Sequence, residues 1–210
     1  MTVIVGFEGI SCVGKTTVIE RVSQGQNIPY IAEVNEVPAG ISGSFGIQEW
    51  FFKNTLFNVR NNTKNRSEKD LLIFDRTFFS SLAYTMALDK INRTKFFHPL
   101  LIKYQEEVDN SENYPDLSIV LTENQETVIE RIKKKFGYHP EWSNPLFVDC
   151  FGRSLSRIIH ESGKPYKTIR TRDFKTEEIM GSLQKGHLRK GFSAFLAEYY
   201  RNLPNPHKSE

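Results

Sequence analysis

Short apolar runs alternate with longer periodic segments along most of this chain. Five runs rich in Val, Ile and Leu have the length of buried strands, and they span residues 2–7, 30–34, 71–74, 117–121 and 166–169. The segments between them repeat apolar residues at intervals of about 3.6, which is typical of helices that bury one face. This alternation predicts a doubly wound α/β fold, with one parallel five-stranded sheet and helices on both of its faces.

Three helical stripes are especially regular. Their apolar members are Phe97, Leu100, Leu101, Tyr104 and Val108 in the first, Val128, Ile129, Ile132 and Phe136 in the second, and Phe192, Phe195, Leu196, Tyr199 and Leu203 in the third. We expect one helix for each stripe, the first over 96–108, and a further helix over 78–90. Aromatic residues in the helices at 78–90 and 96–108 are expected to be exposed, which would suit a homodimer.

The composition fits a single domain over residues 1–210, because 39% of the residues are hydrophobic and the chain is long enough to bury a core. The net charge of +3 suits an anionic ligand but is too small to indicate nucleic acid, which is not an expected partner. The chain opens without a basic and apolar leader and has no long apolar stretch, so we expect a cytoplasmic protein without a membrane span. Cys12 and Cys150 are then expected to stay reduced.

A phosphate-binding pattern follows the first apolar run. Residues 9–16 read Gly-Ile-Ser-Cys-Val-Gly-Lys-Thr, the spacing of a P-loop (Walker A motif), between a predicted strand and a predicted helix. Gly9 and Gly14 let successive backbone N–H groups turn toward phosphate oxygens at the helix N-terminus. Lys15 adds a positive charge for the β- and γ-phosphates, and Thr16 supplies a hydroxyl ligand for Mg²⁺. The sequence therefore predicts a site for ATP and Mg²⁺, and its nucleotide-binding residues are Gly9, Ser11, Cys12, Val13, Gly14, Lys15, Thr16 and Thr17.

A second pair of polar residues, Asp75 and Arg76, comes directly after the apolar run 71–74. Ligands bind at the carboxyl ends of the strands in folds of this kind, so both side chains are candidate catalytic residues beside Lys15. Asp75 would hold Mg²⁺ through water or accept a proton from the substrate, and Arg76 would stabilise charge on a transferring phosphoryl group. A surface ion pair that caps the next helix is the alternative interpretation.

Four stretches of the sequence resemble the thymidylate kinase family, within the wider group of P-loop nucleoside and nucleoside-monophosphate kinases. They are the P-loop at 7–17, the segment 75–84 with its DR-x-x-x-S-x-x-A-Y pattern, the stretch 56–60, and Pro115-Asp116-Leu117. The resemblance implies a five-stranded parallel sheet and transfer of the γ-phosphoryl group of ATP to an acceptor that lies over the sheet. It also implies that Phe57 stacks on a base, that Arg60 bonds the edge of that base, and that Arg76 grips the acceptor phosphate.

Two departures from that family concern the acceptor. Ser11 stands where the family usually has an acidic residue that helps to hold a sugar hydroxyl, and the second strand is followed by Glu33-Val34-Asn35-Glu36 where the family has Glu-Pro. Glu36 or Glu33 would serve as the base that a hydroxyl acceptor needs and a phosphate acceptor does not. We assign Glu36 both to catalysis and to substrate binding, with a solvated loop carboxylate as the alternative.

A basic segment follows the fourth predicted strand. Residues 131–157 are rich in lysine and arginine and are expected to form a helical lid that shields phosphoryl transfer from water. Part of this charge fits an ordinary solvated helix face, because Glu130 and Lys134 have the spacing of an i,i+4 pair. Arg153 is the lid residue that we assign to catalysis. Beyond the last strand, Arg172 is expected to border adenine, by analogy with related kinases.

Several classes of protein share a P-loop. Regulatory GTPases need an Asn-Lys-x-Asp motif and transporter ATPases a Leu-Ser-Gly-Gly motif, and this sequence has neither. The leading hypothesis is ATP-dependent phosphorylation of a nucleoside monophosphate, with a pyrimidine deoxynucleotide as the first choice. Phosphorylation of a nucleoside or a similar metabolite at its 5′-hydroxyl is the alternative. A polynucleotide 5′-kinase and a catalytically silent nucleotide-binding protein also stay open.

Overall fold

The computed structural model describes residues 3–34, 36–63, 71–175 and 192–204. The strands are β1 (Val3–Glu8), β2 (Tyr30–Ile31), β3 (Leu71–Asp75), β4 (Leu117–Thr122) and β5 (Tyr166–Arg170). The helices are α1 (Lys15–Gln26), α2 (Ser44–Thr63), α3 (Phe78–Asn92), α4 (Phe97–Lys103), α5 (Gln105–Val108), α6 (Gln125–Phe136), α7 (Pro145–Glu161) and α9 (Phe192–Asn202), with short 3₁₀ turns η1 (Ser111–Asn113) and η2 (Thr171–Asp173). The five predicted strands are therefore all present.

The strands form one parallel sheet in the order β2-β3-β1-β4-β5, as predicted. β1 lies at its centre, where Phe7 pairs with Asp75 of β3 and Glu8 pairs with Val120 of β4. All strands point the same way because a helical connection returns the chain to the starting edge after each strand. The carboxyl ends of β1 and β3 therefore lie side by side, and the loops that follow them face a common site.

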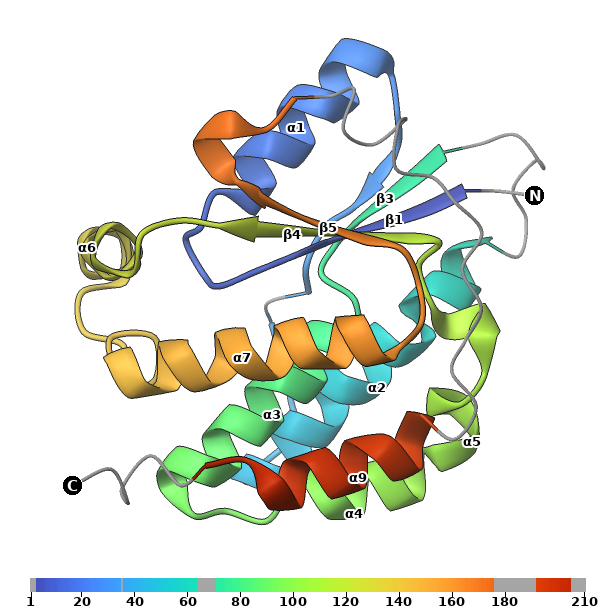
Figure 1. Ribbon diagram of the computed structural model, residues 1–210, viewed down its shortest axis with the longest axis vertical. Coiled ribbons are helices and arrows are strands. Elements are labelled where there is room, and N and C mark those ends of the chain that lie inside the picture. The colour runs from blue at the N-terminus through green and yellow to red at the C-terminus, as the bar shows by residue number, and fades with distance from the viewer. Residues whose placement is uncertain (1–2, 35, 64–70, 176–191, 205–210) are drawn as a thin grey trace.

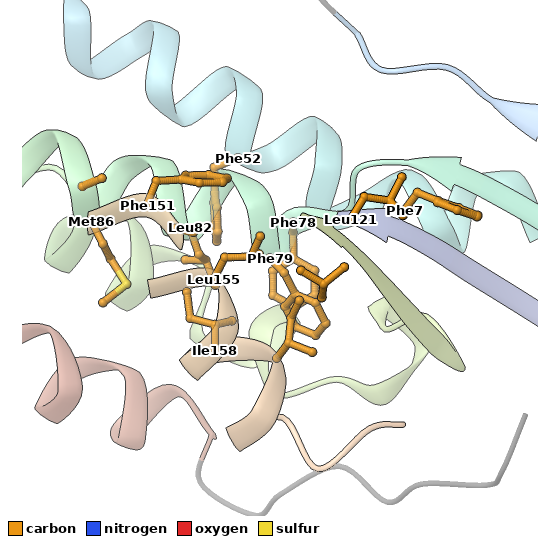
Figure 2. Packing of buried hydrophobic residues seen from close by; sticks show 14 of the residues in the cluster. Phe7, Phe52, Phe78, Phe79, Leu82, Met86, Leu121, Phe151, Leu155 and Ile158 are labelled. Atoms are coloured by element: carbon orange, nitrogen blue, oxygen red, sulfur yellow. The ribbon is translucent and has the colours of Figure 1, made fainter. Parts of the chain in front are cut away.

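Helices cover both faces of the sheet, as Figure 1 shows with the sheet seen nearly edge-on. α1 lies on one face, α2, α3 and α7 lie on the other, and α4, α5 and α9 form an outer layer beyond α3. Aromatic and aliphatic side chains from the sheet, α2, α3 and α7 fill the space between these layers, among them Phe7, Phe52, Phe78, Phe151 and Ile158 (Figure 2). This core fixes the strand ends that carry the site.

The helix α3 is buried on nearly every side. Phe78 and Phe79 have no exposed surface, and Phe97 of α4 is also fully buried. The expectation of exposed aromatic residues at 78–90 and 96–108 is therefore wrong, because the outer helices cover the face that a surface helix would present to water. Those residues therefore give no support to a homodimer.

Some element boundaries differ from the predictions. β2 ends at Ile31, earlier than predicted, and an irregular connection leads from it to α2. The helix expected over 96–108 is split at Tyr104, whose backbone leaves the helical region at φ −119° and ψ 27° and whose hydroxyl donates to Glu49 Oε1 at 2.9 Å. Phe136, expected on a buried stripe, is 49% exposed. No helix in the described part of the chain combines the length and apolar character that a membrane span requires.

The range predicted as a lid, 131–157, spans the end of α6, the connection at 137–144 and most of α7. α7 packs its apolar face on the core, with Phe147, Phe151 and Leu155 buried. This part of the range is a core helix, so only the end of α6 and the connection are open to solvent on several sides, as the 81% exposure of Tyr138 illustrates.

Candidate active site

The P-loop connects β1 to α1 and depends on two glycines. Gly9 has φ +140°, and a Cβ atom there would lie 2.5 Å from the carbonyl oxygen of Leu121. Gly14 has φ +106° and is the N-cap residue of α1; a Cβ there would lie 2.8 Å from the Thr171 side chain. Both positions therefore exclude larger residues for two reasons, the backbone angle and the close neighbour. Cys12 also adopts a positive φ, +60°, so the loop curls tightly in front of the helix N-terminus.

Lys15 lies inside this curl and is only 5% exposed. Its ammonium group donates to the carbonyl oxygens of Gly9 and Ile10, at 3.3 and 3.2 Å. Burial, aided by the positive charge of Arg76, lowers the pKa of Lys15 to about 8, while Asp75 acts in the opposite direction. A highly charged anion such as a triphosphate would add negative charge beside this buried ammonium group and favour its protonated form.

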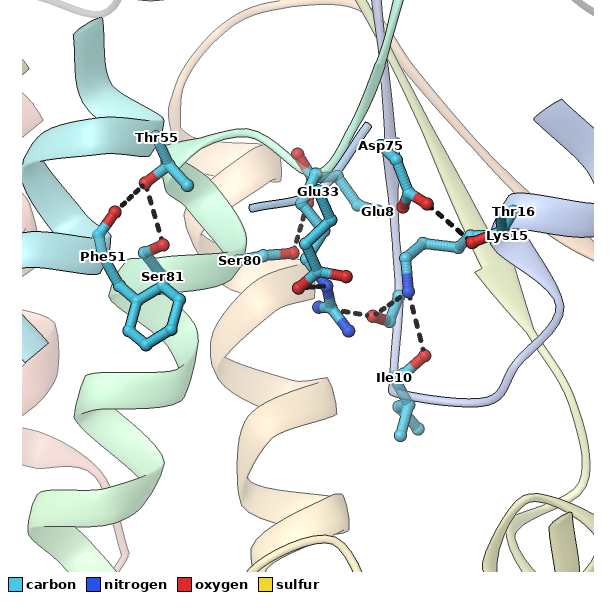
Figure 3. Close-up of polar contacts among 12 residues, drawn as sticks. Glu8, Ile10, Lys15, Thr16, Glu33, Phe51, Thr55, Asp75, Ser80 and Ser81 are labelled. Carbon is cyan, nitrogen blue, oxygen red and sulfur yellow. Dashed lines mark hydrogen bonds and ion pairs between the residues drawn. The ribbon is translucent and has the colours of Figure 1, made fainter. Parts of the chain in front are cut away.

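Thr16 and Asp75 meet across the ends of α1 and β3 (Figure 3). The Thr16 hydroxyl donates to Asp75 Oδ2 at 2.8 Å. The other carboxylate oxygen, Oδ1, is buried and has no hydrogen-bond partner among the described residues. A hydroxyl and a carboxylate with an unused oxygen are the ligand types that Mg²⁺ takes beside nucleotide phosphates, so these two residues fit the predicted metal site.

Arg76 is held between the P-loop and the end of β2. Its Nη1 donates to the Gly9 carbonyl at 2.9 Å, and its Nε lies 2.7 Å from Glu33 Oε1. Burial works against its charge, but Glu33 and Asp75 together raise the pKa of Arg76 above its ordinary value. Arg76 is only 8% exposed and stays positive, so the site presents a fixed cation beside a carboxylate.

Behind this pair lies a second carboxylate, Glu8, the last residue of β1. It is fully buried, and its oxygens accept from the Thr77 backbone N–H at 2.9 Å, from the Thr77 hydroxyl at 2.5 Å and from the Ser80 hydroxyl. Burial raises the pKa of Glu8 to about 7, against the hydrogen bonds and the charge of Arg76, which lower it.

Side chains from the α6–α7 connection and from α3 close another side of the site. The Arg76 guanidinium lies 5.9 Å from the ring centre of Trp142, and Trp142 contacts the ring of Tyr84 at 5.6 Å. On the α2 side, the Thr55 and Ser81 hydroxyls are hydrogen-bonded to each other at 2.8 Å. The Arg76 guanidinium thus lies beside aromatic rings, surroundings that suit a ring with polar edges.

The structure separates two predicted substrate residues from this site. Arg60 pairs with Glu112 at 3.6 Å, beside η1 and therefore near the amino ends of the strands. α2 starts at the carboxyl edge of the sheet and runs about 30 Å over its 20 residues toward the opposite edge, so a residue near its end cannot reach the P-loop side. The structure therefore does not bring Arg60 to the site, and its predicted contact with a base is left without support. Phe57, one turn earlier, is half-buried against the core, a packing role that leaves its predicted stacking without support.

Other predicted residues lie near the site without touching its centre. Glu36 is exposed, whereas Glu33 reaches Arg76, so the geometry favours Glu33 of the two candidate bases. Arg153 pairs with Asp149 at 2.5 Å on the outer face of α7, where it lines a groove of about 700 Å³ that is also lined by Ile10. Arg172 is largely exposed and lies 3.8 Å from Asp173.

Three contacts were not anticipated from the sequence. Thr171, next to Arg172, donates to the Val13 carbonyl of the P-loop at 2.8 Å. Glu8 binds the residues after Arg76, and Trp142 covers the Arg76 guanidinium. The contacts of Glu8 could have been expected from the sequence, because a carboxylate that ends a buried apolar run needs buried hydrogen-bond donors. Nothing in the sequence pattern predicted the contacts of Thr171 and Trp142.

The remaining residues of the loop differ in their exposure to solvent. Val13 is fully buried, Ser11 and Cys12 are partly exposed, and Thr17 is exposed on the first turn of α1. Cys12 and Cys150 are both free thiols, in agreement with the expectation. The nucleotide-binding roles assigned to these positions stay predictions.

Among known proteins, similarity to this chain is found in solved structures. No protein-family model matches the chain, and no curated protein sequence matches it. Among solved structures, a deoxyadenosine kinase from M. mycoides with bound dATP is similar with a TM-score of 0.66 and 17% sequence identity, over 85% of this chain and 97% of that chain. A structure of the same enzyme with the products dCMP and a flexible dCDP is similar with a TM-score of 0.61, and one with bound dCTP has a TM-score of 0.56. Each has 16% sequence identity and the same coverage of both chains. The chain therefore has the P-loop kinase fold of these structures, a five-stranded parallel sheet flanked by helices.

Proposed function

We propose that the protein is an ATP-dependent kinase that phosphorylates a nucleoside at its 5′-hydroxyl, with deoxynucleosides as the first acceptors to test. The observation that carries this proposal is the pairing of Glu33 with Arg76 at 2.7 Å, beside the P-loop. A carboxylate at that place is what a hydroxyl acceptor requires. The shared fold with structures of deoxyadenosine kinase is consistent with it.

In this proposal each residue of the site has its own role in the phosphoryl transfer. Glu33 takes the proton of the 5′-hydroxyl while the 5′-oxygen of the acceptor forms a bond to the γ-phosphorus of ATP. The bond between the γ-phosphorus and the β–γ bridging oxygen breaks, and ADP leaves. Arg76 stabilises the negative charge on the transferring group, and Lys15 binds the β- and γ-phosphates. Mg²⁺, held by Thr16 and Asp75, would neutralise phosphate charge. The connection at 137–144 would close over the acceptor and exclude water.

A nucleoside monophosphate kinase is the second candidate. The segment 75–84 resembles that of thymidylate kinases, and in such an enzyme Arg76 would hold the acceptor phosphate. The two candidates make different demands on Glu33, because a phosphate acceptor carries no hydroxyl proton to remove at neutral pH.

Measurement of ADP release separates the candidates. The protein, with ATP and Mg²⁺, is tested against deoxynucleosides, nucleosides, nucleoside monophosphates and 5′-hydroxyl oligonucleotides, with Lys15→Ala as the inactive reference. We expect a deoxynucleoside to give the highest rate, and product analysis to find the phosphate on the 5′-oxygen. A preference for monophosphates or oligonucleotides would favour the corresponding rival, and no acceptor-dependent release above the Lys15→Ala level would refute kinase activity.

A further inference from the structure

The carboxylate of Glu8 has no part in the proposed phosphoryl transfer, although it lies within the same group of charges. It is fully buried at the end of β1, where it faces Arg76 from the turn after β3 and Lys15 from α1, while α3 contributes only the uncharged Thr77 and Ser80. A buried carboxylate costs free energy unless its oxygens accept hydrogen bonds. Three donors meet this requirement, and all three belong to the first turn of α3 and its N-cap.

The residue between these donors and β3 is Arg76, whose backbone is strained. Its φ is +73°, in the left-handed region, which is sterically unfavourable for a residue with a side chain. Such a conformation persists only where the surroundings hold it on both sides. The Arg76 N–H donates to the Phe7 carbonyl at 2.9 Å and its Nη1 to the Gly9 carbonyl, so two of these restraints come from the residues on either side of Glu8.

Together these contacts form a clamp in which three consecutive residues, Phe7, Glu8 and Gly9, hold one turn. Phe7 binds the backbone of Arg76, Gly9 binds its guanidinium, and Glu8 fixes the next residue, Thr77, through both its N–H and its hydroxyl. Thr77 also caps α3, and a Cβ added at Gly6 would lie 2.7 Å from its methyl group. The turn is thus packed as well as hydrogen-bonded.

We propose that Glu8 is a positioning residue, which locks the Arg76 turn so that the guanidinium stays between the P-loop and Glu33. Its effect on turnover assumes the proposed kinase activity, whereas its effect on the turn does not. The role needs hydrogen-bond acceptance rather than negative charge. An amide can replace the carboxylate, because its oxygen accepts from Thr77 and its NH₂ group can donate to the Ser80 hydroxyl, which can act as donor or acceptor.

The test compares Glu8→Gln and Glu8→Leu with a matched control, Asp116→Leu. Asp116 is also a carboxylate that binds β1, but at the opposite end, where it accepts from the Ile4 N–H at 2.9 Å. Two quantities are measured for each variant: the exchange rates of the backbone amides of residues 77–80, and kcat with KM for ATP. Amide exchange needs no substrate, so it separates failure of this inference from failure of the proposed activity.

We expect Glu8→Leu to speed amide exchange at 77–80 by at least about tenfold and to lower kcat by about a hundredfold with KM for ATP little changed. Glu8→Gln should keep both quantities within about threefold of the wild type, and Asp116→Leu should alter neither, even if it unfolds more readily. Two results would overturn the inference. One is a wild-type rate of amide exchange at 77–80 in Glu8→Leu, and the other is a change in exchange rate and kcat in Glu8→Gln as large as in Glu8→Leu. If Glu8→Leu does not fold, Ser80→Ala, which removes one donor, must speed exchange at 77–80 in its place, and unchanged exchange would overturn it equally.

Discussion

The carboxylate of Glu33 and the guanidinium of Arg76 are paired at 2.7 Å, although 43 positions separate them along the sequence. The pairing follows from the sheet order, because β2 and β3 are neighbours and their carboxyl ends open on the same edge. It gives the candidate site a carboxylate and a fixed cation in contact, beside the lysine of the P-loop.

Replacement of Glu33 by Gln should lower phosphorylation of a nucleoside by about a hundredfold or more, because the amide cannot take the hydroxyl proton. Glu36→Gln is the matched control, since Glu36 is a nearby exposed carboxylate, and it should retain near wild-type turnover. Steady-state rates with the best acceptor test this. Equal losses in both variants, or none in Glu33→Gln, would exclude Glu33 as the base.

Replacement of Asp75 by Asn should raise the Mg²⁺ concentration required for half-maximal activity by roughly 10- to 100-fold, because the variant loses the carboxylate charge beside Thr16. Titration of Mg²⁺ at fixed ATP measures the change. An unchanged Mg²⁺ requirement, with a lower rate at every concentration, would assign Asp75 to another role.

Glu8 should make stability depend on pH in a particular direction. Its pKa is raised from 4.5 to about 7, so between these values the folded protein keeps a proton that the unfolded chain releases. The stability gained from that proton is complete below pH 4.5 and is lost as the pH rises through 7. Relative to wild type, Glu8→Gln should therefore gain up to about 3 kcal/mol between pH 4.5 and 8. Urea unfolding at several pH values measures the difference, and a constant difference would contradict the shift.

Replacement of Arg60 by Ala tests the contact with a base that the family resemblance implies for this residue. Arg60 is 43% exposed and pairs only loosely with Glu112, so its loss should cost less than about 1 kcal/mol of stability. Acceptor KM and kcat should stay within about twofold of wild type, because its place at the amino edge of the sheet keeps it from the site. A large rise in acceptor KM would return Arg60 to the substrate site.

Two glycine substitutions in the first quarter of the chain should have opposite effects. Gly14→Ala would place a methyl group against Thr171 at a φ of +106°, so it should destabilise the protein by more than about 1 kcal/mol and weaken ATP binding. Gly25→Ala, in the open second half of α1, should stabilise it by about 0.5–1 kcal/mol. Thermal unfolding with and without ATP and Mg²⁺ checks both, and ATP binding by Gly14→Ala at wild-type affinity would contradict the role of the turn.

The sequence was informative where the relevant residues are contiguous. The strand pattern predicted the parallel sheet, and the local spacing of Gly9, Gly14, Lys15 and Thr16 predicted a loop that the structure places at the end of β1. Asp75 was also placed correctly beside Thr16, since a buried strand that ends in a carboxylate delivers it to the same edge.

Relationships between distant segments were beyond the reach of such patterns. The selection of Glu33 over Glu36 depends on where β2 stops and turns, and the covering of Arg76 by Trp142 depends on how α7 packs. The structure places Arg60 away from the site that the family resemblance implies for it, because a match of letters to a motif carries no information about which end of a 20-residue helix faces the site.

The hydrogen bond from Thr171 to the Val13 carbonyl spans 158 positions of the sequence. The turn of the P-loop and the first turns of α1 are local and can form early, but Thr171 arrives only when β5 has joined the sheet beside β4. The loop thus acquires its last support from the final strand of the sheet to be synthesised. We therefore expect tight nucleotide binding only after the whole sheet has assembled, and not merely its first half.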